Sequence, residues 1–125
     1  MLFRSKHNLI CLQETHGEDA ETQLFLSSVL PHWKAFVSGS RTQGDELFAP
    51  GAGGVAIIVA PEVWSTVQHH SFNIINTGRC VAVSLNFAHF DLNIMNVHNY
   101  GLSRQQVLGI GRHLALWHEI GRAHV

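Results

Sequence analysis

The apolar residues of this chain fall into short runs bounded by polar residues, glycine or proline. Leu9–Leu12 and Val55–Ala60 are too short for a stable isolated helix, and their unbroken apolar character is typical of strands buried on both faces. Pro61 closes the second run, as expected at the end of a central strand. We therefore expect a sheet that is built around these two runs.

A later part of the chain alternates between apolar and polar residues. Cys80–Phe87 and Leu92–His98 lie on either side of a short polar connection and predict an antiparallel hairpin. The residues that share one face are Val81, Val83, Leu85 and Phe87 on the first strand, and on the second either Leu92, Ile94 and Asn96 or, in the other parity, Met95 and Val97. Val63–Asn76 indicates one or two strands nearer an edge, and Trp33–Ser38 indicates a further strand.

Helix signals stand at both ends of this strand region. Asp19 is a candidate N-cap for a helix over Ala20–Leu30, which Pro31 would end. Ser103 and Gln106 have the spacing of a capping box that starts a helix near the C-terminus. Between the strands, residues 39–54 are rich in glycine and predict a long loop. Strands with a covering helix at either end indicate an α+β fold.

Composition limits the class of protein. A chain of 125 residues with 46% hydrophobic and 14% charged residues is expected to form one globular domain. Its formal net charge of -1 gives no basic excess from which nucleic-acid binding could be claimed. The ten histidines are scattered and lack the spacing of a zinc site. Cys11 and Cys80 lie in strand-like runs, so we expect free thiols and an intracellular location. No run is long enough to span a membrane, and Met1–His7 lacks the core of a secretory signal.

The first apolar run leads directly into chemically active side chains. Glu14 follows the strand and is itself followed by Thr15 and His16. A carboxylate at a strand end is held by a rigid element and still opens onto solvent, which suits a ligand of Mg²⁺. The alternative is a solvated acid that merely closes the strand, which is common for surface carboxylates.

Three motifs resemble one known family. Leu12–His16 reads LQETH and resembles a signature of the endonuclease/exonuclease/phosphatase superfamily, which includes apurinic-site endonucleases, the endonucleases of non-LTR retrotransposons, DNase I and sphingomyelinases. Gly53–Val59 resembles the GGVAI strand of that family, and Gly78–Val83 with Ile94–His98 resembles its next hairpin, in the same order. The resemblance implies the N-terminal half of a DNase I-like four-layer α/β-β/α sandwich, in which mixed sheets pack face to face with helices outside.

The same resemblance implies a chemistry. The parent protein would be a Mg²⁺-dependent phosphodiesterase, with Glu14 as the metal ligand, His98 as a phosphate contact or transition-state stabiliser, and Asn99 as a further phosphate contact. Arg79 is expected to be structural. The alternatives are a strand-end histidine that bonds a neighbour and an asparagine that starts a turn. We expect Glu14 and His98 to lie within roughly 8 Å, about the span of one hydrated Mg²⁺ with its ligands.

The chain also departs from the family pattern. The Asp-x-Asn pair and the Ser-Asp-His that supplies the activating histidine have no counterpart up to residue 118, and neither Asn8 nor Asp91 is placed to replace a missing group. We therefore expect residues 1–118 to form a partial domain that is inactive alone. Residues 119–125 resemble a translated sequencing-library adapter and are expected to be a non-native tail.

Two further interpretations remain open. The chain would be either a catalytically dead module that binds phosphate or nucleic acid, or an incomplete reading frame with no independent function. The LQETH and GGVAI motifs favour the retrotransposon-like or apurinic-site-like branch of the family, and hence nucleic acid as the partner. The substrate is otherwise open among DNA, RNA, a lipid and an inositol phosphate.

Overall fold

The computed structural model describes residues 8–40, 53–99 and 101–123, the last segment with side chains as far as Trp117. The elements in chain order are β1 (Leu9–Gln13), α1 (Asp19–Val29), β2 (Lys34–Ser38), β3 (Val55–Val59), α2 (Pro61–Trp64), β4 (His69–Asn76), β5 (Cys80–Asn86), β6 (Asp91–Val97) and α3 (Arg104–Ala123). The expected α+β class is confirmed.

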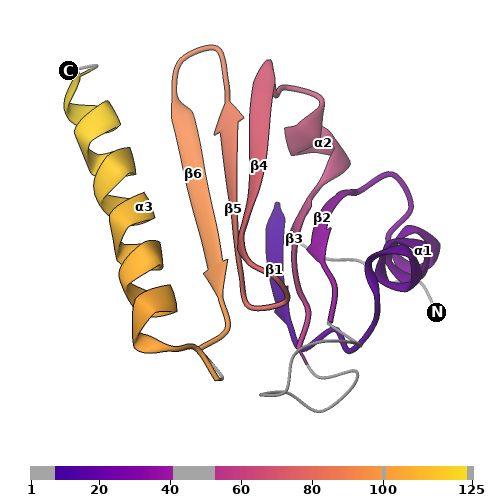
Figure 1. Ribbon diagram of the computed structural model, residues 1–125. Helices are drawn as coiled ribbons and strands as arrows, with labels where there is room; N and C mark the ends of the chain where they lie inside the picture. Colours follow the sequence, from indigo (N-terminus) through magenta and orange to yellow (C-terminus); the bar gives the residue numbers. More distant parts are fainter. Residues whose placement is uncertain (1–7, 41–52, 100, 124–125) are drawn as a thin grey trace.

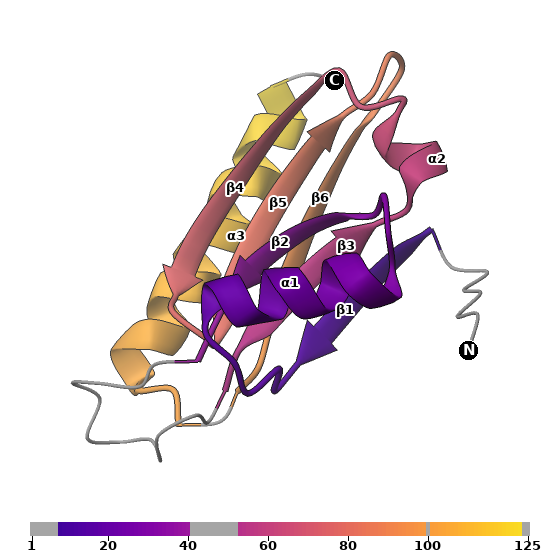
Figure 2. The same cartoon turned by 90° about the vertical axis from the view of Figure 1, so that its right-hand side faces the viewer.

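The strands form two sheets that face each other. One sheet has the order β1-β3-β2 and the other β4-β5-β6. Figure 1 shows the layers side by side, with α3 outside the second sheet and α1 outside the first. Figure 2 shows α1 crossing the outer face of the first sheet, with the second sheet and α3 behind it. The described part of the chain is therefore layered as helix, sheet, sheet and helix.

The strand pairing differs from the expected mixed sheets. All four strand pairs of the described residues are antiparallel. Short turns join β4 to β5 and β5 to β6, and a short turn can join only antiparallel neighbours, since parallel strands need a long crossover.

The main core lies between the two sheets. It consists of Phe36, Val55, Ile57, Val59, Val81, Val83 and Leu85. Ile94 and Phe87 pack against this cluster. The predicted hairpin is confirmed, with Val83 opposite Ile94 and Val81 opposite Asn96. Because directly paired residues share a face, Asn96 points inward with the apolar side chains.

The first apolar run is not buried as expected. Val55–Val59 forms the fully buried centre of its sheet, whereas β1 lies at an edge, with Cys11 exposed and Leu9, Ile10 and Leu12 only half-buried. Both runs are apolar throughout, and that pattern alone does not distinguish a central strand from an edge strand. The expectation that Leu9–Leu12 is buried on both faces is therefore wrong.

Helix α1 packs on the first sheet through Leu26, and its C-cap Leu30 joins the same cluster with Val37, Ala56 and Ile58. Its N-cap is Glu18, without a side-chain capping bond, and not the expected Asp19. The carboxylate of Asp19 instead accepts a hydrogen bond from the backbone N–H of Gly39. This long-range bond, made to a residue at the end of β2, takes the place of a local cap.

The C-terminal helix begins as predicted. The N–H of Ser103 donates to Gln106 Oε1 and the N–H of Gln106 donates to Ser103 Oγ, at 2.7 and 3.2 Å, which is a complete capping box. Ile110 on this helix is buried. Helix α2 was not expected, although Pro61 suits the first turn of a helix.

Most of the predicted loop, residues 41–52, lies outside the described residues. Within the described helices, none is both long and apolar enough to cross a membrane.

Candidate functional site

A buried side-chain amide links the two sheets beneath the end of β1. Asn96 on β6 is only 4% exposed, and its Nδ2 donates hydrogen bonds to the carbonyl oxygens of Leu12 and Ala56 at 2.9 and 3.0 Å. Gln13 in turn donates from Nε2 to Asn96 Oδ1 and to the carbonyl oxygen of Val97, at 3.1 and 2.7 Å. Three of these four bonds hold the C-terminal ends of β1 and β6 together, and the fourth, to Ala56, ties β6 to β3.

Glu14 and His98, the residues that follow these strand ends, meet as a consequence. Glu14 Oε1 lies 3.2 Å from His98 Nε2. The expectation that they come within roughly 8 Å is therefore confirmed. The Glu14 side chain is 51% exposed and that of His98 only 19%, so the carboxylate opens to solvent while the imidazole is largely shielded. Their proposed chemical roles stay predictions.

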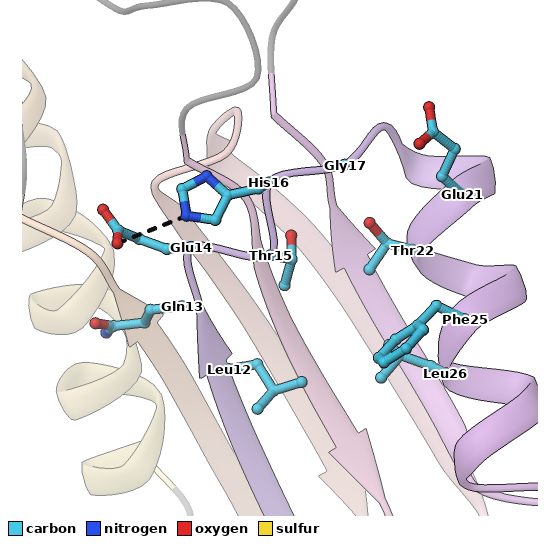
Figure 3. A pocket seen from close by; sticks show the side chains of 10 residues that line it. All are labelled: Leu12, Gln13, Glu14, Thr15, His16, Gly17, Glu21, Thr22, Phe25 and Leu26. Atoms are coloured by element: carbon cyan, nitrogen blue, oxygen red, sulfur yellow. Dashed lines mark ion pairs between the residues drawn. The ribbon is translucent and has the colours of Figure 1, made fainter.

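His16 approaches the same carboxylate from the other side. Its Nε2 lies 3.8 Å from Glu14 Oε2, and its side chain is 58% exposed. Figure 3 shows the two side chains leaning toward each other above the end of β1. Glu14 and His16 both have positive φ, 55° and 56°, which a non-glycine residue adopts only at a cost of about 1 kcal/mol or more. The chain therefore leaves β1 through a strained turn that aims both groups at one place.

Two glycines on the neighbouring chain segment pack against this turn. The N–H groups of Thr15 and His16 donate to the carbonyl oxygens of Gly54 and Gly53, at 3.2 and 2.9 Å. Both glycines have positive φ, and a Cβ at Gly54 would collide with Thr15 Oγ1. A Cβ at Gly53 would collide with the guanidinium of Arg79. The close approach of Thr15 and Arg79 thus explains why two glycines precede β3.

Arg79 lies behind the site and is 3% exposed. Its Nη1 donates to the carbonyl oxygen of Gly78 at 3.1 Å, and its own carbonyl oxygen accepts from the backbone N–H of His98 at 2.7 Å. The residue therefore fixes the backbone of His98 directly, in agreement with a structural role.

The remaining sequence candidates lie at different places. Asn99 is exposed and follows His98 directly. Asp91 begins β6 at the opposite end from His98 and accepts a hydrogen bond from Asn86, so it cannot complete the site. Asn8 precedes β1 at the opposite end from Glu14. Neither of these two residues replaces a missing catalytic group.

A cavity of about 390 Å³ opens next to Glu14, between the end of β1 and helix α1. It is lined by Leu12, Gln13, Glu14, Thr15, His16, Gly17, Glu21, Thr22, Phe25 and Leu26. In Figure 3 the Glu14 carboxylate points away from the α1 side of this cavity, where Thr22 and Phe25 lie. The cavity adjoins Glu14, and its α1 side is lined by two polar side chains, Glu21 and Thr22, and two apolar ones, Phe25 and Leu26.

Sequence reasoning missed the residues that assemble the site. Gln13 and Asn96 were not singled out, although each is a polar residue on the inward parity of an apolar strand. That placement is a usable signal for Asn96, because a buried amide must find hydrogen-bond partners. The structure also places His16, whose side chain is exposed, beside Glu14.

The donor set at the site is small. In the described segments of the chain, no group of three or more His, Cys, Asp or Glu side chains could hold a metal ion. Glu14 therefore offers a single carboxylate with two imidazoles nearby, in a position open to solvent.

Comparisons of the chain with known protein families, with curated proteins and with solved structures found no match.

Proposed function

We propose that this chain carries the cation-binding and phosphate-binding part of the site of a magnesium-dependent phosphodiesterase that acts on nucleic acid. The observation that supports the proposal is the 3.2 Å contact between Glu14 and His98, which come from two different sheets. The motifs that resemble endonucleases contain these same two residues, LQETH at one end and the strand ending in His98 at the other.

The Glu14 carboxylate suits Mg²⁺ better than zinc. Mg²⁺ takes oxygen ligands, keeps several waters and commonly uses only one or two protein carboxylates together with substrate phosphates. Zinc needs three or four protein ligands, and the described residues contain no such group. When bound, Mg²⁺ would polarise a phosphoryl oxygen and stabilise the leaving group.

His98 would hold the phosphate. Its imidazole is shielded from solvent and faces the Glu14 carboxylate, so a proton on Nε2 is directed toward the place where the cation and the phosphate would meet. An Nε2–H group there would donate a hydrogen bond to a phosphate oxygen. Asn99 is exposed next to it and offers an amide donor to the same group. These residues bind and orient the substrate, and none of them is placed as the base that activates water.

The purified chain is therefore expected to bind the cation without turnover. Titration with Mn²⁺, a paramagnetic substitute for Mg²⁺, should broaden the NMR signals of Glu14, His16 and His98, and excess Mg²⁺ should reverse the effect. Glu14→Gln should abolish the broadening, while Glu62→Gln, at an exposed acid on α2, should leave it unchanged. Equal broadening in Glu14→Gln would contradict the proposed cation site.

An activity measurement separates the alternatives. Abasic and nicked DNA should remain uncut by the chain in Mg²⁺, and Mg²⁺-dependent cleavage that disappears in Glu14→Gln would contradict the inactive half-site. Weak, salt-dependent DNA binding that persists in Glu14→Gln would instead favour a binding module without a catalytic site.

A further inference from the structure

Strand β1 has an open edge. It pairs with β3 on one side and, in the part of the chain that the structure describes, with no strand on the other. The carbonyl oxygen of Asn8 accepts a hydrogen bond from Ala60 N–H, so Asn8 points its backbone groups toward β3. Since these directions alternate along an antiparallel strand, Leu9, Cys11 and Gln13 point their N–H and C=O groups outward.

This edge lacks the usual protection against pairing. Natural edge strands carry charged residues, proline or a bulge that discourages another strand from docking. The segment Leu9–Gln13 contains no charge and no proline, and its register with β3 runs without a shift. The edge is therefore suited to accept an additional strand.

Apolar side chains are exposed next to the edge. A groove of about 250 Å³ with a wholly apolar lining runs between β1 and α1, lined by Ile10, Leu12, Phe25, Leu26, Val29, Leu30 and Ile58. On α1, Leu24 is 73% exposed and Phe25 is 63% exposed. Exposed apolar groups of this size beside an open strand edge typically mark an interaction surface.

We propose that a second copy of this chain occupies the edge, with the two β1 strands paired antiparallel about a two-fold axis at Cys11. In this register Cys11 faces Cys11 of the second copy, and Leu9 faces Gln13. The backbone N–H and C=O groups of all three residues point outward, so each residue gains hydrogen-bond partners on the second copy. The pairing would join the three strands of each copy into one continuous sheet.

The charge pattern favours a second copy as the occupant. A two-fold interface brings the same surface of both molecules together, so a charged residue at its centre would be repelled by the same residue of the other copy. β1 carries no charge, and α1 carries none after Glu21. Outside the strand, Asn8 would face Glu14 of the second copy, which pairs an amide with a carboxylate. Both α1 helices would lie on the same face of the joined sheet, with the apolar groove beside each β1 strand between them. This proposal does not depend on the proposed function.

Cys11 gives a direct measurement of the register. Directly opposed, hydrogen-bonded residues of antiparallel strands have Cα atoms about 5.5 Å apart, within the range of about 4.4–6.8 Å that a disulfide spans. Oxidation with copper(II)-phenanthroline should therefore link the two copies. Two thiols lose two protons to solvent and two electrons to two copper(II) ions, and one S–S bond forms.

The experiment uses the whole chain. Wild type should give a covalent dimer on a non-reducing gel, and peptide mapping should show the Cys11–Cys11 link. Cys80→Ser should form the same dimer, because Cys80 is buried, whereas Cys11→Ser should not. In reducing buffer, sedimentation should show a concentration-dependent dimer whose association constant falls at least tenfold in Cys11→Lys, which places a charge at the axis.

Three results would overturn the proposal. These are a chain that stays monomeric at every concentration, a dimer that Cys11→Lys leaves unchanged, and a dimer that oxidation does not link through Cys11. The Mn²⁺ titration measures the cation site at Glu14 separately.

Discussion

The side-chain amide of Gln13 donates a hydrogen bond to Asn96 Oδ1, 3.1 Å away, across the interface between the two sheets. Gln13 is the last residue of β1, and Glu14 follows it directly. Asn96 is the second-last residue of β6, and His98 is the first residue after that strand. The distance between the two candidate site residues is therefore set by an amide pair that is itself outside the proposed chemistry.

Asn96→Ala should lower the free energy of unfolding by about 2–3 kcal/mol, because it removes three hydrogen bonds made by a buried amide. Asn93→Ala is the matched control on the same strand, since Asn93 is exposed and accepts one bond from Ser84. Urea unfolding measures both variants. Equal losses in the two variants would show that the amide link between the sheets contributes little.

Gly54→Ala should destabilise the protein by about 2 kcal/mol or more, since alanine disfavours a positive φ and its Cβ would strike Thr15. Gly111→Ala provides the opposite case. A Cβ there meets nothing within 4 Å on helix α3, so alanine should stabilise by about 0.5–1 kcal/mol. Thermal unfolding of both variants would reveal the sign of each change, and stabilisation by Gly54→Ala would contradict the described turn.

Glu14→Gly should raise the stability by about 0.5–1 kcal/mol, because glycine adopts the left-handed conformation of this position without strain. Mn²⁺ binding should be lost in the same variant. His32→Gly is a control, as His32 also has a positive φ, of 73°, and is exposed away from the site. The His32→Gly variant should be more stable than the wild type, with no change in cation binding. A less stable Glu14→Gly would show that the turn is not strained.

Stability should fall in alkaline solution because of Cys80. Burial raises the pKa of this thiol from 9.0 to about 11. Below pH 9 the thiol keeps its proton in both states, and above pH 9 it ionises first in the unfolded chain, which lowers the free energy of unfolding. The loss should reach about 2–3 kcal/mol as the pH rises through 11.

Urea unfolding between pH 8 and pH 11 measures this effect. Cys80→Ala should be less stable at pH 8, because it leaves a small void in the sheet, and should lose less stability as the pH rises. Parallel curves for wild type and Cys80→Ala would mean that the buried thiol does not cause the loss. Burial also raises the pKa of the Cys11 thiol, so part of the slope should remain in the variant.

Much of the local structure could be predicted from the sequence. The hairpin of β5 and β6 and the capping box of α3 depend on residues close together in the chain, so their alternation and spacing were sufficient signals. The N-cap of α1 was mistaken because the carboxylate of Asp19 bonds Gly39, a partner on another element. Local rules describe Asp19 correctly as a capping residue and cannot include a competitor twenty positions away.

The sequence by itself determined most of the strands and the two longer helices, and it singled out Glu14 and His98 as candidates through motifs. Only the tertiary structure decided that β1 is an edge strand, that Glu14 sits in a left-handed turn, and that His16 joins it. The physical reason is that secondary structure follows from periodicity over a few residues. The site instead depends on hydrogen bonds between Gln13 and Asn96, residues 83 positions apart, which exist only once both sheets have packed.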